Sequence, residues 1–163
     1  MSEMRKMAQS ATTTSILETI QPLECKGKLK FYWQNCFTYV QVSDDFTNNP
    51  LKVLGPLGYH TVPLMNKEDS PRTHISVMTA TERNRITRRR LRDVANKWRY
   101  KDVPFKVVGV ESWFHQVQKT GDTKWLYVLK IESPQINEIR GSLGLQPFST
   151  YYNMHMTICE KPV

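Results

Sequence analysis

The chain has 163 residues, enough for one domain or for two small lobes around a shared core. It has a charged content of 23%, no apolar run of transmembrane length and three cysteines without metal-ligand or disulfide spacing, which excludes a membrane span, a zinc module and a disulfide scaffold. Its formal net charge of +8 favours anionic partners such as nucleotides and nucleic acid.

The N-terminal part of the chain carries little folding signal. Residues 1–24 are expected to form a mobile polar tail or one short element, and residues 25–163 to form a single folded domain. Residues 28–33 and 37–42 are aromatic and β-branched runs separated by polar residues, which predicts a β-hairpin.

The middle of the chain predicts a loop, a brief strand and one long helix. Residues 44–50 are rich in turn formers, and the short apolar run at 51–54 is typical of a strand. Thr79 and Glu82 form a capping-box pattern, after which apolar residues recur at helical spacing. The expected helix covers residues 79–98.

The expected helix also has a strongly basic face, which includes Arg88 and Arg89. Such a charge run is usually a solvated helix face, and that interpretation is favoured here. The alternative is an electrostatic funnel that steers an anionic substrate. On that alternative, Arg88 and Arg89 are candidate substrate-binding residues.

The C-terminal half predicts a second hairpin and a second helix. Residues 105–117 and 124–131 read as two strands joined by a turn. Ser133 followed by Pro134 is the pattern of a helix N-cap and first helical position, and Gly144 marks the end of that helix.

Five aromatic residues are candidates for stacking on a nucleobase, since every base offers a π-face. They are Trp33, Trp113, Trp125, Tyr151 and Tyr152. Aromatic residues on strands more often pack in a core. Tyr151 and Tyr152 are the best placed for binding, because they precede the final strand closely.

Two strand-like segments share the order histidine, apolar, hydroxyl, apolar. In a strand, the histidine and the hydroxyl point to one face and the apolar side chains to the other. A lone histidine on a strand is more often structural than catalytic, but the repeat of the whole pattern favours function. The segments are His74-Ile75-Ser76-Val77 and His155-Met156-Thr157-Ile158. Cys159 is expected on the face of His155 and to act as a small packing residue.

This combination suits phosphodiester chemistry. One imidazole can take a proton from the attacking hydroxyl or water, and a second can protonate the leaving oxygen, because histidine titrates near neutral pH. The hydroxyls of Ser76 and Thr157 can donate to the phosphoryl oxygens. We therefore expect His74 and His155 to be the acid and base, with no metal or cofactor. Their individual roles depend on the substrate's direction in the site.

The paired motifs resemble those of the 2H phosphoesterase superfamily, which carries one His-x-Ser/Thr-x motif in each half of a two-lobed fold. The resemblance implies an α+β architecture in which antiparallel sheets form a central groove and helices pack outside. It implies that His74, Ser76, His155 and Thr157 act on a nucleotide, RNA or cyclic oligonucleotide. The substrates that the resemblance implies include 2',3'-cyclic phosphates and 2'-5'-linked oligoadenylates. The small size is similar to that of viral enzymes that degrade cyclic oligonucleotide immune signals.

Two other classes of function fit the same residues. The domain can bind an RNA end or a nucleotide without turnover, or it can be a basic structural protein whose histidines are incidental. The retention of all four motif side chains favours the enzyme, a metal-independent phosphodiesterase. The cysteine usage favours a reducing, cytoplasmic compartment.

Overall fold

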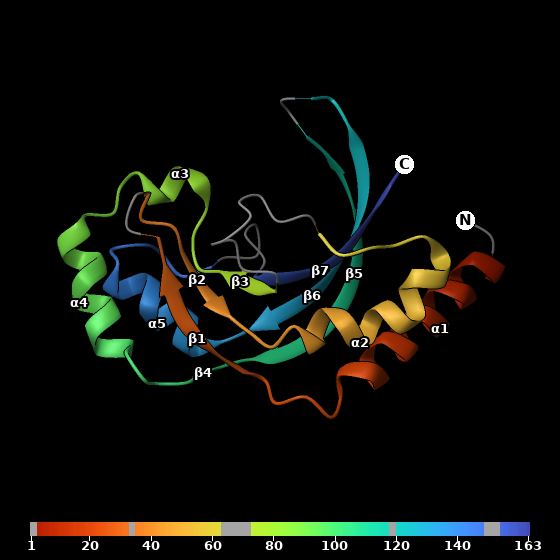
Figure 1. Ribbon diagram of the computed structural model, residues 1–163, viewed down its shortest axis with the longest axis horizontal. Coiled ribbons are helices and arrows are strands. Elements are labelled where there is room, and N and C mark those ends of the chain that lie inside the picture. The colour runs from red at the N-terminus through yellow and green to blue at the C-terminus, as the bar shows by residue number, and fades with distance from the viewer. Residues whose placement is uncertain (1–2, 33–34, 63–72, 118–119, 149–153) are drawn as a thin grey trace.

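The computed structural model describes residues 3–32, 35–62, 73–117, 120–148 and 154–163, with only the backbone for residues 5–9. In these residues the chain forms a curled seven-stranded antiparallel sheet in the order β4-β1-β2-β3-β7-β6-β5, with helices outside it (Figure 1). This confirms the α+β fold expected from the sequence. The strands are β1 (Lys26–Phe31), β2 (Thr38–Gln41), β3 (His74–Ser76), β4 (Val103–Pro104), β5 (Lys106–Gln116), β6 (Thr123–Glu132) and β7 (His155–Pro162).

The helices gather into two groups at opposite ends of the sheet (Figure 1). The first two pack on each other, and the last three lie around the β1 and β4 side. They are α1 (Glu3–Ile20), α2 (Asp45–Leu54), the short 3-10 helix η1 (Gly55–Leu57), α3 (Ala80–Arg83), α4 (Arg88–Trp98) and α5 (Pro134–Ser142). None of the helices in the described part of the chain combines the length and the apolar character needed to cross a membrane.

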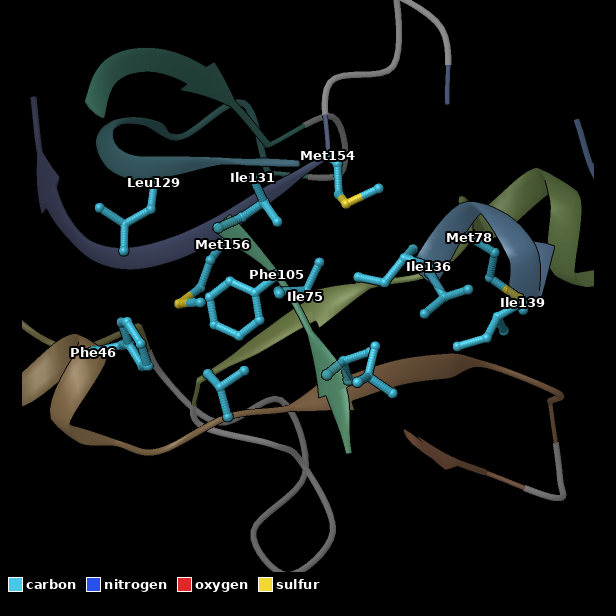
Figure 2. Packing of buried hydrophobic residues seen from close by; sticks show 14 of the residues in the cluster. Phe46, Ile75, Met78, Phe105, Leu129, Ile131, Ile136, Ile139, Met154 and Met156 are labelled. Carbon is cyan, nitrogen blue, oxygen red and sulfur yellow. The ribbon is translucent and has the colours of Figure 1, made fainter. Parts of the chain in front are cut away.

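The hydrophobic core lies on one face of the sheet, and the apolar positions of both motif strands point into it. Ile75 and Met156 are fully buried, together with Leu129 of β6 and Phe46 of α2. Figure 2 shows these side chains around the ring of Phe105. Burial of one such side chain contributes about 1.5–3 kcal/mol, so both motif strands are anchored by their apolar residues.

Several local signals in the sequence are confirmed by the structure. The first hairpin is β1 paired with β2, and the second is β5 paired with β6. The Thr79 hydroxyl accepts from the Glu82 amide at 3.2 Å, and the Thr79 amide donates to the Glu82 carboxylate at 2.9 Å. Ser133 caps α5 by accepting from the Ile136 amide at 3.2 Å. Gly144 follows α5 with a positive φ of 79°, which glycine adopts readily.

The N-terminal segment, for which a mobile tail or one short element was expected, is occupied over most of its length by the 18-residue helix α1. Ile16 and Ile20 lie one turn apart and are buried in the core. The side-chain amide of Asn49 on α2 donates to the Thr19 carbonyl at 3.0 Å. Packing against α2 therefore stabilises a segment whose own composition predicts little structure.

The loop and brief strand expected for residues 44–54 are wrong, because α2 occupies them. Phe46, Pro50 and Leu54 recur every four residues and form one buried stripe. Pro50 lacks a backbone N–H and usually disfavours a helix interior. Here the helix continues through Pro50, because its apolar stripe is buried against the sheet and against α1.

The long helix expected over residues 79–98 is divided into α3 and α4. A second cap makes the division, because the Thr87 hydroxyl accepts from the Arg90 amide at 3.2 Å. Thr87 has an extended backbone, which ends one helical run and begins another. Leu91, Val94 and Trp98 then bury the inner face of α4.

A buried arginine ties α5 to the end of the first motif strand. Arg140 is only 3% exposed and donates to both carboxylate oxygens of Glu82, at 3.0 and 2.8 Å. It also donates to the carbonyl of Val77 at 2.7 Å and to that of Gln146 at 2.8 Å. Arg140 thereby connects the residue after Ser76 with the segment that leads to the second motif.

We expect Glu82→Gln to lower the free energy of unfolding by about 3 kcal/mol, because it leaves the buried Arg140 charge without its carboxylate. Hydrogen bonds from Arg140 hold the pKa of Glu82 below its ordinary value of 4.5. The Glu82–Arg140 pair therefore stabilises the fold fully at pH values above the ordinary glutamate pKa. This stabilisation is lost as the pH falls through the lowered pKa of Glu82. Urea unfolding of both proteins at about pH 7 and about pH 3 measures it.

Glu138→Gln is the matched control. Its carboxylate pairs with Lys97 at 3.2 Å, and both side chains are about half exposed. Such a pair contributes less than about 1 kcal/mol. Equal losses in the two variants would show that the Glu82–Arg140 pair does not stabilise the fold.

Candidate active site

The register of the sheet brings the two motifs together. β3 and β7 are neighbouring antiparallel strands in which Ile75 pairs with Met156. One residue further along, His74 therefore stands opposite Thr157, and Ser76 stands opposite His155. All four side chains are partly exposed and lie on the face away from the core. These four residues are called the motif face below.

The two histidines occupy diagonal positions of this face. Diagonal neighbours across an antiparallel pair are about 7–8 Å apart. Two side chains at such backbone positions can approach opposite sides of one phosphoryl group, with a hydroxyl opposite each of them. Acid–base catalysis at phosphorus uses two proton-transfer groups on one face, so these four residues form the candidate active site.

The motif face continues across the neighbouring strands as two rows of paired residues. Residues paired across antiparallel strands share a face, so each row points to the same side of the sheet. The first row is Lys30, Tyr39, Ser76, His155 and Lys130, and the second is Lys28, Gln41, His74, Thr157, Val128 and Glu111. The first row places a lysine of β6 directly beside His155.

His155 is packed against an aromatic ring. The ring centroids of Trp113 and His155 are 4.6 Å apart, and the Lys130 ammonium lies 5.3 Å from the Trp113 centroid. Trp113 donates from its indole nitrogen to Glu111 at 2.6 Å, and Glu111 lies 3.8 Å from the Lys130 ammonium. These contacts fix the Trp113 ring over His155 and keep a cation at the site.

His74 has aromatic neighbours on the other side of the motif face. The rings of Tyr39 and Phe37 meet it nearly perpendicularly, with centroids at 5.7 and 6.3 Å. Tyr32 packs against both of these rings. Such contacts restrict the imidazole to a narrow range of orientations.

Comparison with known proteins identifies the family of the chain. The family model described as Swiss Army Knife, 2H phosphoesterase domain matches residues 38–163, which is well over half of the chain and includes both motif strands. The chain belongs to this 2H phosphoesterase family. No curated protein and no solved structure matches the chain. Family membership places the chain among enzymes that act on phosphoester bonds.

The structure places the other predicted site residues of this 2H phosphoesterase in different environments. Trp113 joins the motif face through its contact with His155. Arg88 and Arg89 are exposed on α4, outside the two rows. Trp125 lies on β6 outside the two rows, with its ring centroid 5.3 Å from that of Phe114. The remaining stacking candidates lie outside the described residues; they are Trp33, Tyr151 and Tyr152.

Lys130 and Tyr39 are two neighbours of the candidate site that the sequence analysis did not single out. Lys130 interrupts the apolar run of residues 125–131 in β6, and this interruption was the available signal. Its side chain is only 15% exposed. Tyr39 stands opposite Ser76 and is 7% exposed. The sequence alone could not place Tyr39 beside Ser76 or Lys130 beside His155, because each pair joins two strands that are far apart in sequence.

Cys159 does not lie on the motif face, which corrects the expectation from strict alternation. The register shifts between Tyr127 and Val128, which pair with Cys159 and Thr157 and leave Ile158 as the extra residue. This β-bulge turns Cys159 toward the core. Burial raises the pKa of its thiol to about 12, so the thiol is protonated at neutral pH. Its expected role as a packing residue agrees with this burial.

Inorganic phosphate should shift the imidazole NMR signals of His74 and His155 and leave that of His60 unchanged. His60 is exposed and its Nδ1 contacts the Thr61 carbonyl, away from the motif face. Lys130→Gln should weaken phosphate binding about tenfold, because a hydrogen bond to a charged group contributes about 1.5 kcal/mol or more.

Lys161→Gln is the control for this titration. Lys161 lies on the same strand as His155, but its ammonium is 5.1 Å from the Tyr59 ring and contacts the Leu57 carbonyl. It should bind phosphate like the wild type. Uniform shifts of all histidine signals would show that the motif face is not an anion site.

Proposed function

We propose that the protein is a metal-independent phosphodiesterase that cleaves a nucleotide or RNA phosphodiester at the motif face. The observation that carries this proposal is the diagonal placement of two histidines, each with a hydroxyl directly opposite, on one partly exposed face. Family membership supports the reaction class. His74, Ser76, His155 and Thr157 are the proposed catalytic residues.

The proposed reaction uses the histidines in opposite protonation states. The neutral imidazole takes the proton of the attacking hydroxyl or water as its oxygen bonds to phosphorus. The bond between phosphorus and the leaving oxygen breaks, and the imidazolium of the other histidine gives that oxygen a proton. After one turnover the first histidine has gained a proton and the second has lost one. Proton exchange with solvent then restores their starting states.

The charge that develops on the phosphoryl oxygens needs donors on the same face. Ser76 and Thr157 supply hydroxyl groups beside the two histidines, and Lys130 supplies a cation next to His155. Donors already held in position stabilise a transition state at no further cost of reorganisation. Trp113 fixes the His155 ring and offers an indole surface to a base.

The candidate substrates are those implied by the 2H resemblance. They are 2',3'-cyclic phosphates, 2'-5'-linked oligoadenylates and cyclic oligonucleotides, the last including the immune signals that viral members degrade. All share a phosphodiester flanked by at least one nucleoside. A turnover screen over these classes in chelator-treated buffer identifies the class that is cleaved.

Replacement of either His74 or His155 with Ala should lower kcat/KM on the order of a hundredfold or more, the usual effect of losing a general acid or base. The double variant should lose much less than the product of the two effects, because the residues act as a unit. The wild-type rate should be unchanged by EDTA and should follow a bell-shaped pH profile.

His60→Ala is the control and should retain wild-type turnover. Full activity of the double variant would place the chemistry elsewhere in the molecule. Tight nucleotide binding without turnover of any substrate class would instead identify a binding module on a phosphoesterase fold.

Arg88 and Arg89 are proposed to steer the anionic substrate rather than to contact the reacting phosphate. Replacement of both with Gln should slow substrate capture more at low salt than at high salt, because screening removes long-range attraction. Stopped-flow association at two salt concentrations measures this, with Lys52→Gln on α2 as the control. An unchanged salt dependence would assign the arginines to an ordinary solvated face.

A further inference from the structure

A groove of about 750 Å³ separates the outer edge of β1 from α4. In the described residues β4 pairs with β1 only at Lys26 and Gly27, so the rest of this edge faces α4 (Figure 1). The groove is called the basic groove below. Its principal lining residues are Lys28, Lys30, Arg92, Trp98, Arg99 and Tyr100.

The basic groove carries cations without carboxylates in its described lining. Lys28 is paired with Asp102 at 2.8 Å and donates to the Tyr100 carbonyl at 3.2 Å, so its charge is partly compensated. No ion pair among the described residues involves Lys30, Arg92 or Arg99. Three positive charges are therefore available to a polyanion.

Aromatic groups line the same groove. The ring of Tyr100 is 83% exposed, and the Arg99 guanidinium lies 5.0 Å from its centroid. Tyr100 has a positive φ of 66°, which is rare for a bulky residue. Trp98 is 8% exposed, and its indole N–H has no acceptor among the described residues. An exposed ring beside arginines is the combination by which proteins hold single-stranded nucleic acid.

The basic groove is continuous with the motif face. Lys30 belongs to the first row, where it pairs with Tyr39, which pairs with Ser76. Neighbouring strands are about 4.8 Å apart, so Lys30 lies roughly 10 Å from Ser76 across the sheet. A strand held at the motif face by its phosphate can thus reach the groove with its next nucleotides.

We propose that the basic groove binds the single strand that extends from the reacting phosphate, so that the substrate is an oligonucleotide several nucleotides long rather than a mononucleotide. The proposal rests on the proposed function for the position of the reacting phosphate. The cations contact the backbone, and Tyr100 stacks on a base. An acidic peptide would satisfy the cations but would leave the exposed ring without a stacking partner.

Binding of fluorescent 2'-O-methyl oligoadenylates, which lack the 2' hydroxyl, tests this on the full chain, with probe integrity checked by chromatography. An eight-nucleotide probe should bind at least about tenfold more tightly than a two-nucleotide probe. Arg92→Gln combined with Arg99→Gln should abolish this advantage. It should also reduce the slope of log affinity against log salt by about 1.4, since each phosphate contact contributes about 0.7.

Tyr100→Asn removes the ring but keeps a residue that accepts a positive φ. It should weaken binding of the longer probe about fivefold or more without changing the salt slope, because stacking on one base contributes about 1–3 kcal/mol. The matched control is Lys52→Gln combined with Lys97→Gln, which removes two charges outside the groove. This control should bind the longer probe within about twofold of the wild type.

Three results would overturn the proposal. They are equal affinity for the two probes, the same loss in the groove variant and in the charge control, and displacement of the probe by polyglutamate as effectively as by unlabelled oligoadenylate. These binding results do not depend on turnover. Length-dependent binding in a protein that cleaves no substrate would contradict the proposed function while leaving the groove assignment intact.

Discussion

The pairing of Ile75 with Met156 is the contact on which the candidate site depends. β3 is only three residues long, and this pair joins it to β7 while both side chains are buried completely. Because side chains alternate along a strand, burial of these two residues directs His74 and His155 to the opposite face. A slip of one residue would move the histidine of the slipped strand into the core. The core therefore sets the register that brings the two motifs together.

A second constraint fixes the end of the first motif strand. Arg140 hydrogen-bonds the carbonyl that follows Ser76 and the carbonyl of Gln146, and it does so while paired with Glu82. A buried charge is costly unless such partners satisfy it. The arginine can occupy this position only when α3, α5 and the end of β3 are all in place. The capping box at Thr79 thus contributes both to a helix end and to the frame of the site.

Several basic residues of the chain lie at the ends of the first row and on the neighbouring helix α4. Lys130 stands at one end of the first row and Lys30 at the other, with Ser76 and His155 between them. The arginines of α4 extend the positive region beyond Lys30. Lys30, Lys130 and Arg92 thus place part of the chain's positive charge along the first row and the basic groove. The basic composition alone does not indicate where an anion would bind, whereas the positions of these residues do.

The sequence by itself determined the local features: the α+β class, the hairpins, the caps at Thr79 and Ser133, and the two histidine motifs with their faces. Each depends on residues only a few positions apart, which a period or a cap pattern reveals. The tertiary structure alone decided that β3 adjoins β7, that Lys130 stands beside His155, and that a bulge turns Cys159 inward. It also made helices of residues 3–20 and 45–54, whose own propensities are weak. The physical reason is that strand neighbours and helix packing are contacts between distant parts of the chain, and burial against a partner outweighs local preference.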